Sequence, residues 1–441
     1  MAETPSYNSA VAQLYDLGHE LARTPSHKFD LAHMRALLVA MGNPQQRFRS
    51  VLIAGTNGKG STAATLASIL RSAGHRTGLY TSPHLVRINE RIRIDDAEIT
   101  DAAFVQAHER VEAAATPLVA SGALPGHPSF FETMTAMAFH HFAQNLVEVA
   151  VLEVGVGGRL DATNVVEPVI SIITDIALDH QKFLGNTVRE IAREKAGIMR
   201  PGGVVVTLPQ HPEANDVIGN TILDSTARGV SAVPYVPPVT PAASTDAAYT
   251  LSVLGEEIQV ESPLPGRHQL RNVALAIAAA VELNQVGIHI SAPQIARGVR
   301  ETRWPGRLQI IPGAPELVLD VAHNPAGAWA LRAALSQRYD ERPLTFLFGI
   351  MRDKAMAEVA EILFPLADRI LATQPGNPRA ATPAEIQQAA SRTAAEIIPE
   401  PSVRAALDRA RELTGPEGVV VVTGSIYLVG EVLALLENSP R

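Results

Sequence analysis

The sequence contains no cysteine among its 441 residues. Disulfide bonds, zinc–thiolate sites and cysteine nucleophiles are therefore excluded. No apolar run reaches the about 18 residues that a membrane-spanning helix needs. The formal net charge of −8 argues against nucleic-acid or membrane-surface partners, because both require a basic patch. The first residues lack the basic-then-apolar layout of a signal peptide, so we expect a cytoplasmic protein.

The composition is that of a folded chain, with 46% hydrophobic and 19% charged residues. A chain of this length is too long for one hydrophobic core, so two domains are expected. In its first part, apolar runs typical of strands alternate with helical stretches, which predicts a mostly parallel sheet covered on both faces. The predicted strands are residues 51–54, 149–154 and 169–174, and the predicted helices are residues 62–73, 131–144 and 188–198.

The middle of the chain has a different pattern. Short β-type runs occur at residues 204–208, 249–253 and 257–260, and a stretch rich in Pro, Ala and Thr covers residues 233–248. We predict that residues 204–262 form an antiparallel appendage with a surface loop.

The helical pattern stops at Trp304-Pro305-Gly306, and a second alternation of strands and helices follows. We predict an α/β domain over residues 1–304 and a Rossmann-like α/β domain over residues 305–441. Two such domains favour an active site in the cleft between them. The second domain's predicted strands are residues 317–321, 344–349, 369–372 and 419–423, and its predicted helices are residues 326–338, 355–364, 383–394, 403–413 and 427–436.

The stretch VLIAGTNGKGSTAATLASIL, residues 51–70, combines a strand, a glycine-rich turn and the start of a helix. Glycines let backbone N–H groups approach phosphate oxygens, the helix dipole favours negative charge, and Lys59 adds a positive charge. The match to the common P-loop pattern is imperfect, because Gly60 separates Lys59 from Ser61 and Ile53 stands where a glycine is expected. We still predict a P-loop ATPase domain, because strand, loop and helix follow in the right order.

Acidic residues end two of the predicted strands. Glu153 ends an apolar strand before a second glycine-rich turn, a position at which carboxylates commonly hold Mg²⁺ beside a phosphate loop. Asp179 and His180 follow another strand, where the imidazole is a candidate metal ligand or general base. Each residue has a structural alternative. Glu153 could face water at the end of its strand, and His180 could have a purely structural role. On charge alone, Glu194 and Lys195 indicate a solvated helix face.

Further polar residues occur near the second domain. His268, Gln269 and Asn272 fall in the first turn of an Ala-rich helix, where they could bind a base or phosphate or could cap the helix. Arg307 lies in the linker, and Asp320 ends the second domain's first strand. Both could reach the interdomain cleft or form a local salt bridge.

The ordered set of motifs GTNGKGS, TSPHL, LEVGVGGRLDATN, DH, EKAGI, GRHQLRN, WPGR, DVAHNP and TGSIYLVGE resembles folylpolyglutamate synthase and dihydrofolate synthase, a family of the ATP-dependent Mur ligase superfamily. The resemblance runs from about residue 27 to residue 431. It implies that ATP is bound by Gly55, Thr56, Asn57, Gly58, Lys59, Gly60, Ser61, Asn272, Arg307 and Asp320. It implies catalytic roles for Lys59, Lys195, His180 and His323.

The resemblance also implies a magnesium site and substrate contacts. Ser82, Glu153 and His180 would ligate Mg²⁺, and Lys195 matches a carbamylated lysine that acts as a further anionic ligand, which reverses the charge-only interpretation of this residue. The implied pterin and glutamate contacts are Phe29, Asp30, Leu31, Ser129, Phe131, Leu160, Asp161, Ala162 and, near the incoming glutamate, His323 and Ser425. Ser129 departs from the family, in which bacterial members often have Thr.

The implied reaction is ATP-dependent amide formation through an acyl phosphate. L-Glutamate would be added to dihydropteroate and to the glutamate tail of reduced folates such as tetrahydrofolate, by an enzyme that the family suggests is monomeric. The alternatives are a monofunctional folylpolyglutamate synthase, another Mur-type ligase and a P-loop ATPase. A Mur ligase of peptidoglycan synthesis carries a UDP-sugar domain before the phosphate loop, and the segment before Gly55 is short for one.

Overall fold

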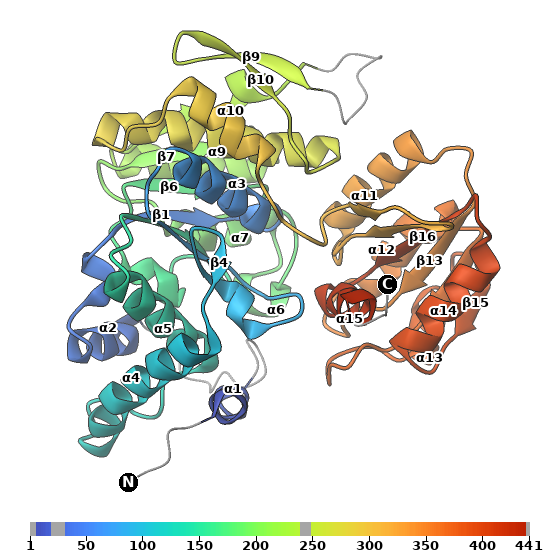
Figure 1. Cartoon of the computed structure of the whole chain (residues 1–441), viewed down its shortest axis with the longest axis horizontal. Coiled ribbons are helices and arrows are strands. Elements are labelled where there is room, and N and C mark those ends of the chain that lie inside the picture. The colour runs from blue at the N-terminus through green and yellow to red at the C-terminus, as the bar shows by residue number, and fades with distance from the viewer. Residues whose placement is uncertain (1–5, 19–30, 239–247, 438–441) are drawn as a thin grey trace.

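The computed structural model describes residues 6–18, 31–238 and 248–437. Two α/β units lie next to each other, each built around its own sheet (Figure 1). In the described ranges, no helix has both the length and the apolar character required to cross a membrane.

The first sheet has eight strands in the order β4-β3-β2-β5-β1-β6-β7-β8. All neighbours from β2 to β8 run parallel, whereas β3 pairs antiparallel with both β2 and β4. The strands are β1 Arg49–Ala54, β2 Thr77–Tyr80, β3 Ile92–Ile94, β4 Ala97–Glu98, β5 Val149–Glu153, β6 Ile170–Ile173, β7 Val204–Thr207 and β8 Arg228–Ser231.

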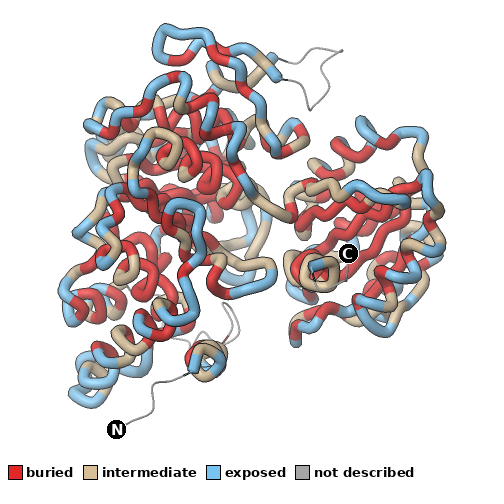
Figure 2. Tube along the Cα trace, in the orientation of Figure 1, coloured by how far each residue is buried: buried red, intermediate tan, exposed pale blue. Residues whose placement is uncertain are grey.

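Both faces of this sheet are buried, because helices cover each of them (Figure 2). Along β1, Leu52 and Ala54 enter one core and Val51 and Ile53 enter the other, as the period of two in a strand requires. The first core receives α1 Tyr7–Asp16, α2 Leu31–Ala40, α4 Asp101–Ala120, α5 Phe130–Gln144, α7 Val188–Ala196 and α8 Pro212–Asp224. The second receives α3 Lys59–Ser72, α9 Arg267–Leu283, α10 Ala292–Arg300 and the hairpin of β9 Tyr249–Val253 and β10 Glu256–Val260.

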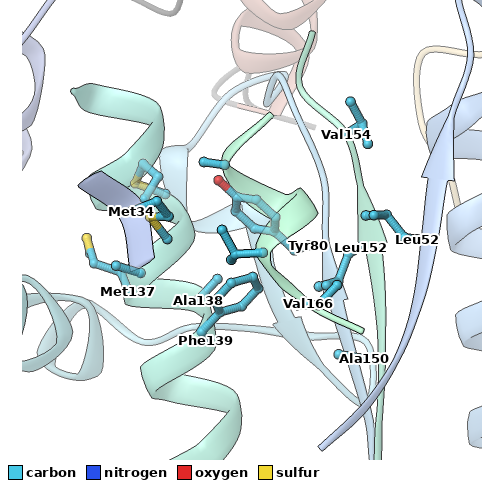
Figure 3. Packing of buried hydrophobic residues seen from close by; sticks show 14 of the residues in the cluster. Met34, Leu52, Tyr80, Met137, Ala138, Phe139, Ala150, Leu152, Val154 and Val166 are labelled. Carbon is cyan, nitrogen blue, oxygen red and sulfur yellow. The ribbon is translucent and has the colours of Figure 1, made fainter. Parts of the chain in front are cut away.

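Large side chains fill the first core between α2, α5 and the sheet. Figure 3 shows Met34 of α2, Phe139 of α5, Tyr80 of β2 and Leu152 of β5 gathered there. All four are fully or almost fully buried. Their packing holds β2 and β5 in place, and the carboxyl ends of these two strands carry Ser82 and Glu153.

The second sheet has six strands in the order β11-β12-β16-β13-β14-β15, all parallel except the pair β11–β12. Its strands are β11 Gln309–Ile311, β12 Glu316–Leu319, β13 Leu344–Phe348, β14 Arg369–Ala372, β15 Ile397–Pro399 and β16 Val419–Thr423. One face is covered by α11 Pro325–Arg338, α12 Met356–Leu363 and α13 Pro383–Ala389, and the other by α14 Val403–Thr414 and α15 Ile426–Glu437. The predicted α/β fold class is confirmed, including its small antiparallel hairpin.

The predicted extent of the appendage was wrong. Residues 204–207 form β7, which pairs parallel with β6 in the main sheet. Helix α8 and strand β8 then complete a strand–helix–strand unit, so the appendage is only the β9–β10 hairpin. The sequence concealed this unit because α8, PEANDVIGNTILD, is largely polar and buries few of its residues. Part of the predicted surface loop, residues 239–247, lies outside the described residues.

The remaining helical segments are short. Helix α6 covers Gln181–Leu184. The 3-10 turns are η1 Pro44–Gln46, η2 Ile88–Arg91, η3 Ala162–Val165, η4 Val233–Tyr235, η5 Asn284–Val286 and η6 Phe364–Leu366.

Candidate active site

A cavity of about 470 Å³ lies between the carboxyl ends of the two sheets. One wall comprises the loops after β1, β2, β5, β6 and β7 together with part of α7 and the start of α9. The opposite wall comprises the loops after β12, β13 and β14, the start of α11 and residues 425–427. Ligands bind at this end of open parallel sheets, so the cavity is the natural candidate for an active site.

The phosphate loop joins β1 to α3. Gly58 caps α3 with a φ of 88°, a conformation that side chains other than glycine rarely adopt. A Cβ atom at Gly58 would also lie 2.2 Å from Oδ1 of Asn272, so the loop and α9 approach closely only because the residue is glycine. The N–H groups of Thr56 and Asn57 donate to the carbonyl oxygen of Asp175 at 2.8 and 3.1 Å, which fixes the loop against the end of β6. The predicted residues Gly55 to Ser61 all line the cavity.

Lys59 and Glu153 lie close to each other on this wall. The Lys59 ammonium donates to the carbonyl oxygen of Thr56 at 3.2 Å and lies 4.0 Å from Oε1 of Glu153. Glu153 is only 4% exposed, and its Oε2 accepts from the backbone N–H of Ser82 at 3.1 Å. A buried carboxylate is costly unless it is paired or metal-bound, so the water-facing alternative for Glu153 is wrong.

His180 and Lys195 complete the predicted metal set. Burial, helped by the charge of Lys354, lowers the pKa of His180 to about 3, so its imidazole is neutral and able to bind a metal. In the described part of the chain, no three His, Asp or Glu residues group as a metal site. The predicted set does not require such a group, because it combines Glu153 and His180 with Ser82 and Lys195. A buried acid, a neutral imidazole and a hydroxyl on one wall fit a hard cation.

The interpretation of Lys195 as a solvated residue was wrong. Lys195 is 3% exposed, and its ammonium donates to the carbonyl oxygen of Gly55 at 2.7 Å. Burial, with the nearby charge of Lys59, lowers its pKa to about 7. Helix α7 lies against the second glycine-rich turn, where a Cβ at Gly158 would lie 3.0 Å from Cα of Lys195. Glu194, by contrast, pairs with Arg159 at 2.9 Å near the surface.

The two walls are joined by a polar network centred on Asp179. Its carboxylate receives the ammonium of Lys354 at 2.7 Å and Nδ2 of Asn324 at 3.1 Å, and Nε2 of His323 lies 3.5 Å away. Burial alone would raise the pKa of Asp179, but the bond from His323 and the charge of Lys354 hold it well below its usual range. Asn324 also donates to Oδ1 of Asn57 at 3.0 Å. The second domain thereby contacts the phosphate loop directly through the residue that caps α11.

Lys354 was missed by the sequence analysis. It lies in the turn after β13 and belongs to none of the motifs singled out in the sequence. Its place in the site is visible only from its ion pair with Asp179 across the cleft. The three predicted ATP residues near the linker do line the cavity. Asn272 donates to Oε1 of Gln269 at 2.9 Å, and the carboxylate of Asp320 accepts from the N–H groups of Leu308 and Ala322 at 2.8 and 2.9 Å.

The structure also bears on the capping alternative for the start of α9 and on the position of Arg307 in the linker. The N-cap of α9 is Gly266, and no side chain caps this helix, so the capping alternative for His268, Gln269 and Asn272 was wrong. Burial lowers the pKa of Arg307, which lines the same cavity.

The predicted pterin residues converge only in part. The ring of Phe131 lies where a Cβ at Gly155 would come within 2.5 Å of it, and Oδ2 of Asp161 accepts from the N–H of Val156 at 3.0 Å. Both therefore contact the second glycine-rich turn. Burial raises the pKa of Asp161. Leu160 and Ala162 flank Asp161, Leu31 begins α2, Ser129 caps α5, and Phe29 and Asp30 lie outside the described residues.

The second wall holds the two residues predicted near glutamate. Ser425 is buried and its Oγ accepts from the N–H of Leu428 at 3.1 Å. Nδ1 of His323 donates to the carbonyl oxygen of Val321 at 2.8 Å, which leaves Nε2 directed at Asp179. Both side chains line the cavity opposite the phosphate loop.

Comparison with known proteins shows the family to which this chain belongs. Residues 53–280 match the Mur ligase middle domain, and residues 306–426 match the Mur ligase glutamate ligase domain. The folylpolyglutamate synthase of Lacticaseibacillus casei is 37% identical over 97% of this chain and 98% of its own length. The chain belongs to the folylpolyglutamate synthase/dihydrofolate synthase family of Mur ligases. The resemblance inferred from the ordered motifs is thereby confirmed.

Other members of the folylpolyglutamate synthase/dihydrofolate synthase family agree. The dihydrofolate synthase/folylpolyglutamate synthase of Bacillus subtilis is 34% identical over 91% of this chain and 94% of its own length. The Mycobacterium tuberculosis folylpolyglutamate synthase complexed with ADP has a TM-score of 0.89 and 32% identity, covering 99% of this chain and all of its own. E. coli FolC in complex with DHPP and ADP has a TM-score of 0.86 and 30% identity, covering 98% and 99%.

Proposed function

We propose that this chain is an ATP-dependent ligase that adds L-glutamate both to dihydropteroate and to the glutamate tail of reduced folates. The observation that carries the proposal is the cavity that Lys59 and buried Glu153 line together with polar residues of the second domain. Full-length similarity to enzymes named for one or both activities supports it. ADP and DHPP bind related structures, which supports the two substrate classes.

The reaction joins two groups that do not condense usefully in water. The acceptor carboxylate attacks the γ-phosphorus of ATP, forming an acyl phosphate and releasing ADP. The amine of L-glutamate then attacks the acyl carbon, and phosphate leaves. The first step brings two anions together, and Lys59 and the loop N–H groups would offset their repulsion. The contact between Asn324 and Asn57 supports a closed arrangement that excludes water and protects the acyl phosphate.

We propose that Ser82, Glu153, His180 and a carbamylated Lys195 hold Mg²⁺. When bound, the ion would neutralise phosphate charge during transfer. Carbamylation requires a neutral amine, and the pKa of about 7 for buried Lys195 supports it. The carbamate would also replace a buried cation, which is unfavourable beside Lys59, with an anion.

We also propose the remaining features of the enzyme. The boundary at residues 304/305 is supported by the two family matches, which end and begin on either side of it. A monomer is supported because one chain supplies both walls of the cavity. A cytoplasmic location is consistent with ATP and folate substrates.

A monofunctional folylpolyglutamate synthase is the second candidate. The relative from Lacticaseibacillus casei carries that name alone and is 37% identical. The positions that would discriminate lie near Phe131 and Asp161, where dihydropteroate would bind.

The deciding experiment measures ADP release with ATP, Mg²⁺ and L-glutamate, comparing 7,8-dihydropteroate with tetrahydrofolate. Glutamate-dependent turnover with both acceptors would support the bifunctional proposal, and turnover with tetrahydrofolate alone would support the second candidate. ADP release that ignores glutamate would contradict both.

A further inference from the structure

Arg379 lies on the second wall of the cavity, in the segment between β14 and α13. The backbone there is held firmly. The carbonyl oxygen of Arg379 accepts from the N–H of Arg352 at 2.9 Å, and its own N–H donates to Oδ1 of Asn377 at 2.9 Å. Met351 and Ala380 form an isolated antiparallel bridge beside it. The position of the side chain's base is therefore fixed before any ligand arrives.

The guanidinium group of Arg379 has unused hydrogen-bonding capacity. Nη2 donates to the hydroxyl of Tyr427 at 3.2 Å, and Cζ lies 5.9 Å from the centre of the same ring. The carboxylate of Asp353 is 3.6 Å from Nη1, too far for a hydrogen bond. Nε is buried with no hydrogen-bond partner. A guanidinium has five N–H donors, so leaving several unmatched while the side chain is only 25% exposed is unfavourable.

Lys354, another cation on this wall, has a closer acidic partner than Arg379 has. Lys354 is only 9% exposed and its charge is matched by Asp179 at 2.7 Å. Arg379 has no acid at that distance among the described residues. It lines the same cavity as His323 and Ser425, opposite the phosphate loop. A planar guanidinium in such a place is suited to binding a carboxylate through two parallel hydrogen bonds.

We infer that Arg379 binds a carboxylate of the incoming L-glutamate, with Tyr427 as the residue that positions it. This inference rests on the proposed function. L-Glutamate brings carboxylates that take no part in the reaction, and holding one of them on the second wall leaves the amine directed across the cavity. The family match of residues 306–426 to a glutamate ligase domain supports this location. The sequence gives Arg379 no motif of its own, which is why it was not among the predicted site residues.

The test is steady-state kinetics of Arg379→Gln with ATP, tetrahydrofolate and varied L-glutamate. The expected result is a KM for L-glutamate raised at least tenfold, with the KM values for ATP and tetrahydrofolate within twofold of wild type. Arg379→Lys keeps the positive charge but lacks the planar guanidinium. Its KM for L-glutamate should lie between those of wild type and Arg379→Gln. Tyr427→Phe keeps the ring and should raise the KM for glutamate by a few-fold. Arg392→Gln, at an arginine 82% exposed on the same domain, is the matched control.

Two results would overturn the inference. One is an unchanged KM for L-glutamate in both Arg379 variants. The other is a raised KM only for folates with longer glutamate tails, which would assign Arg379 to the acceptor. If Arg379→Gln fails to fold, judged by its thermal midpoint, the same comparison is made with Arg379→Lys. An inactive wild type would instead refute the proposed function, whereas an active wild type with unaffected variants would refute only this inference.

Discussion

The two domains place their functional residues at the same end of a parallel sheet, but they use different chemistry there. The first wall is built from backbone, with glycines at which a Cβ would collide with Asn272 or with the main chain of Lys195. The second wall presents long cationic side chains, Lys354 and Arg379, without a glycine cradle. Close backbone N–H groups suit phosphate, whereas the planar fork of an arginine side chain matches the geometry of a carboxylate.

The domains also differ in how their charges are matched. Glu153 and Lys59 face each other within the first wall. Lys354 finds its partner, Asp179, only across the cleft. The first half-site is therefore complete in its own domain, and the second depends on how the domains meet.

The largest expected effect comes from removing charges of the first wall. Lys59→Ala and Glu153→Ala should each lower turnover by on the order of 10³-fold or more, because transition-state charge loses its nearest partners. Circular dichroism should show that both variants fold. Glu167→Ala, which removes an exposed acid paired with Arg200, is the control and should remain active. Near-normal turnover in either site variant would contradict the assignment of this wall.

A smaller effect is expected from separating the walls. Asp179→Asn and Lys354→Met each remove one charge of a buried pair, which costs about 3–5 kcal/mol. Each should lower glutamate-dependent turnover roughly a hundredfold, which is the change expected if about 2.7 kcal/mol of this cost falls on the transition state.

The double variant distinguishes coupling from independent roles. Asp179→Asn combined with Lys354→Met should be no worse than the poorer single variant, because the two act as one contact. Effects that multiply would show that each residue works alone. Asp216→Asn breaks the exposed pair with Arg189 and should change turnover less than twofold.

This contrast explains what the sequence could predict. The phosphate loop and Glu153 were found because their chemistry needs consecutive residues at the end of one strand. Lys354 and Arg379 were missed because each is a single residue whose partner lies far along the chain, Asp179 for Lys354 and Tyr427 for Arg379. Lys195 was misjudged from charge alone, since the burial of α7 depends on its contact with Gly158.

A third prediction tests whether the backbone cradle itself binds phosphate. Gly58→Ala should raise the KM for ATP by about tenfold or more, because its Cβ would collide with Asn272 in addition to the strain of a φ of 88°. Gly74→Ala is a matched control with a φ of 89° and no atom within 4 Å. It should lose about 1 kcal/mol of stability and keep its ATP affinity. Equal losses of ATP affinity in both variants would mean that strain, and not the cradle, is responsible.

The last prediction concerns the buried amine of the first wall and is read as stability in CO₂-free buffer. Burial lowers the pKa of Lys195 from 10.5 to about 7. Between these values the unfolded chain binds more protons than the folded one, so the free energy of unfolding rises with pH in this window. The penalty of burying the amine is fully present below pH 7 and is lost near pH 10.5.

Lys195→Met removes that penalty. The variant should be more stable than wild type by on the order of 2–4 kcal/mol at about pH 6.5, and the difference should shrink steadily towards about pH 10. Urea unfolding at several pH values measures it, with Lys182→Met as the control at an exposed lysine. A difference independent of pH would show that Lys195 stays charged in the fold. The first wall would then keep a buried cation beside Lys59, where the proposed carbamate requires a neutral amine.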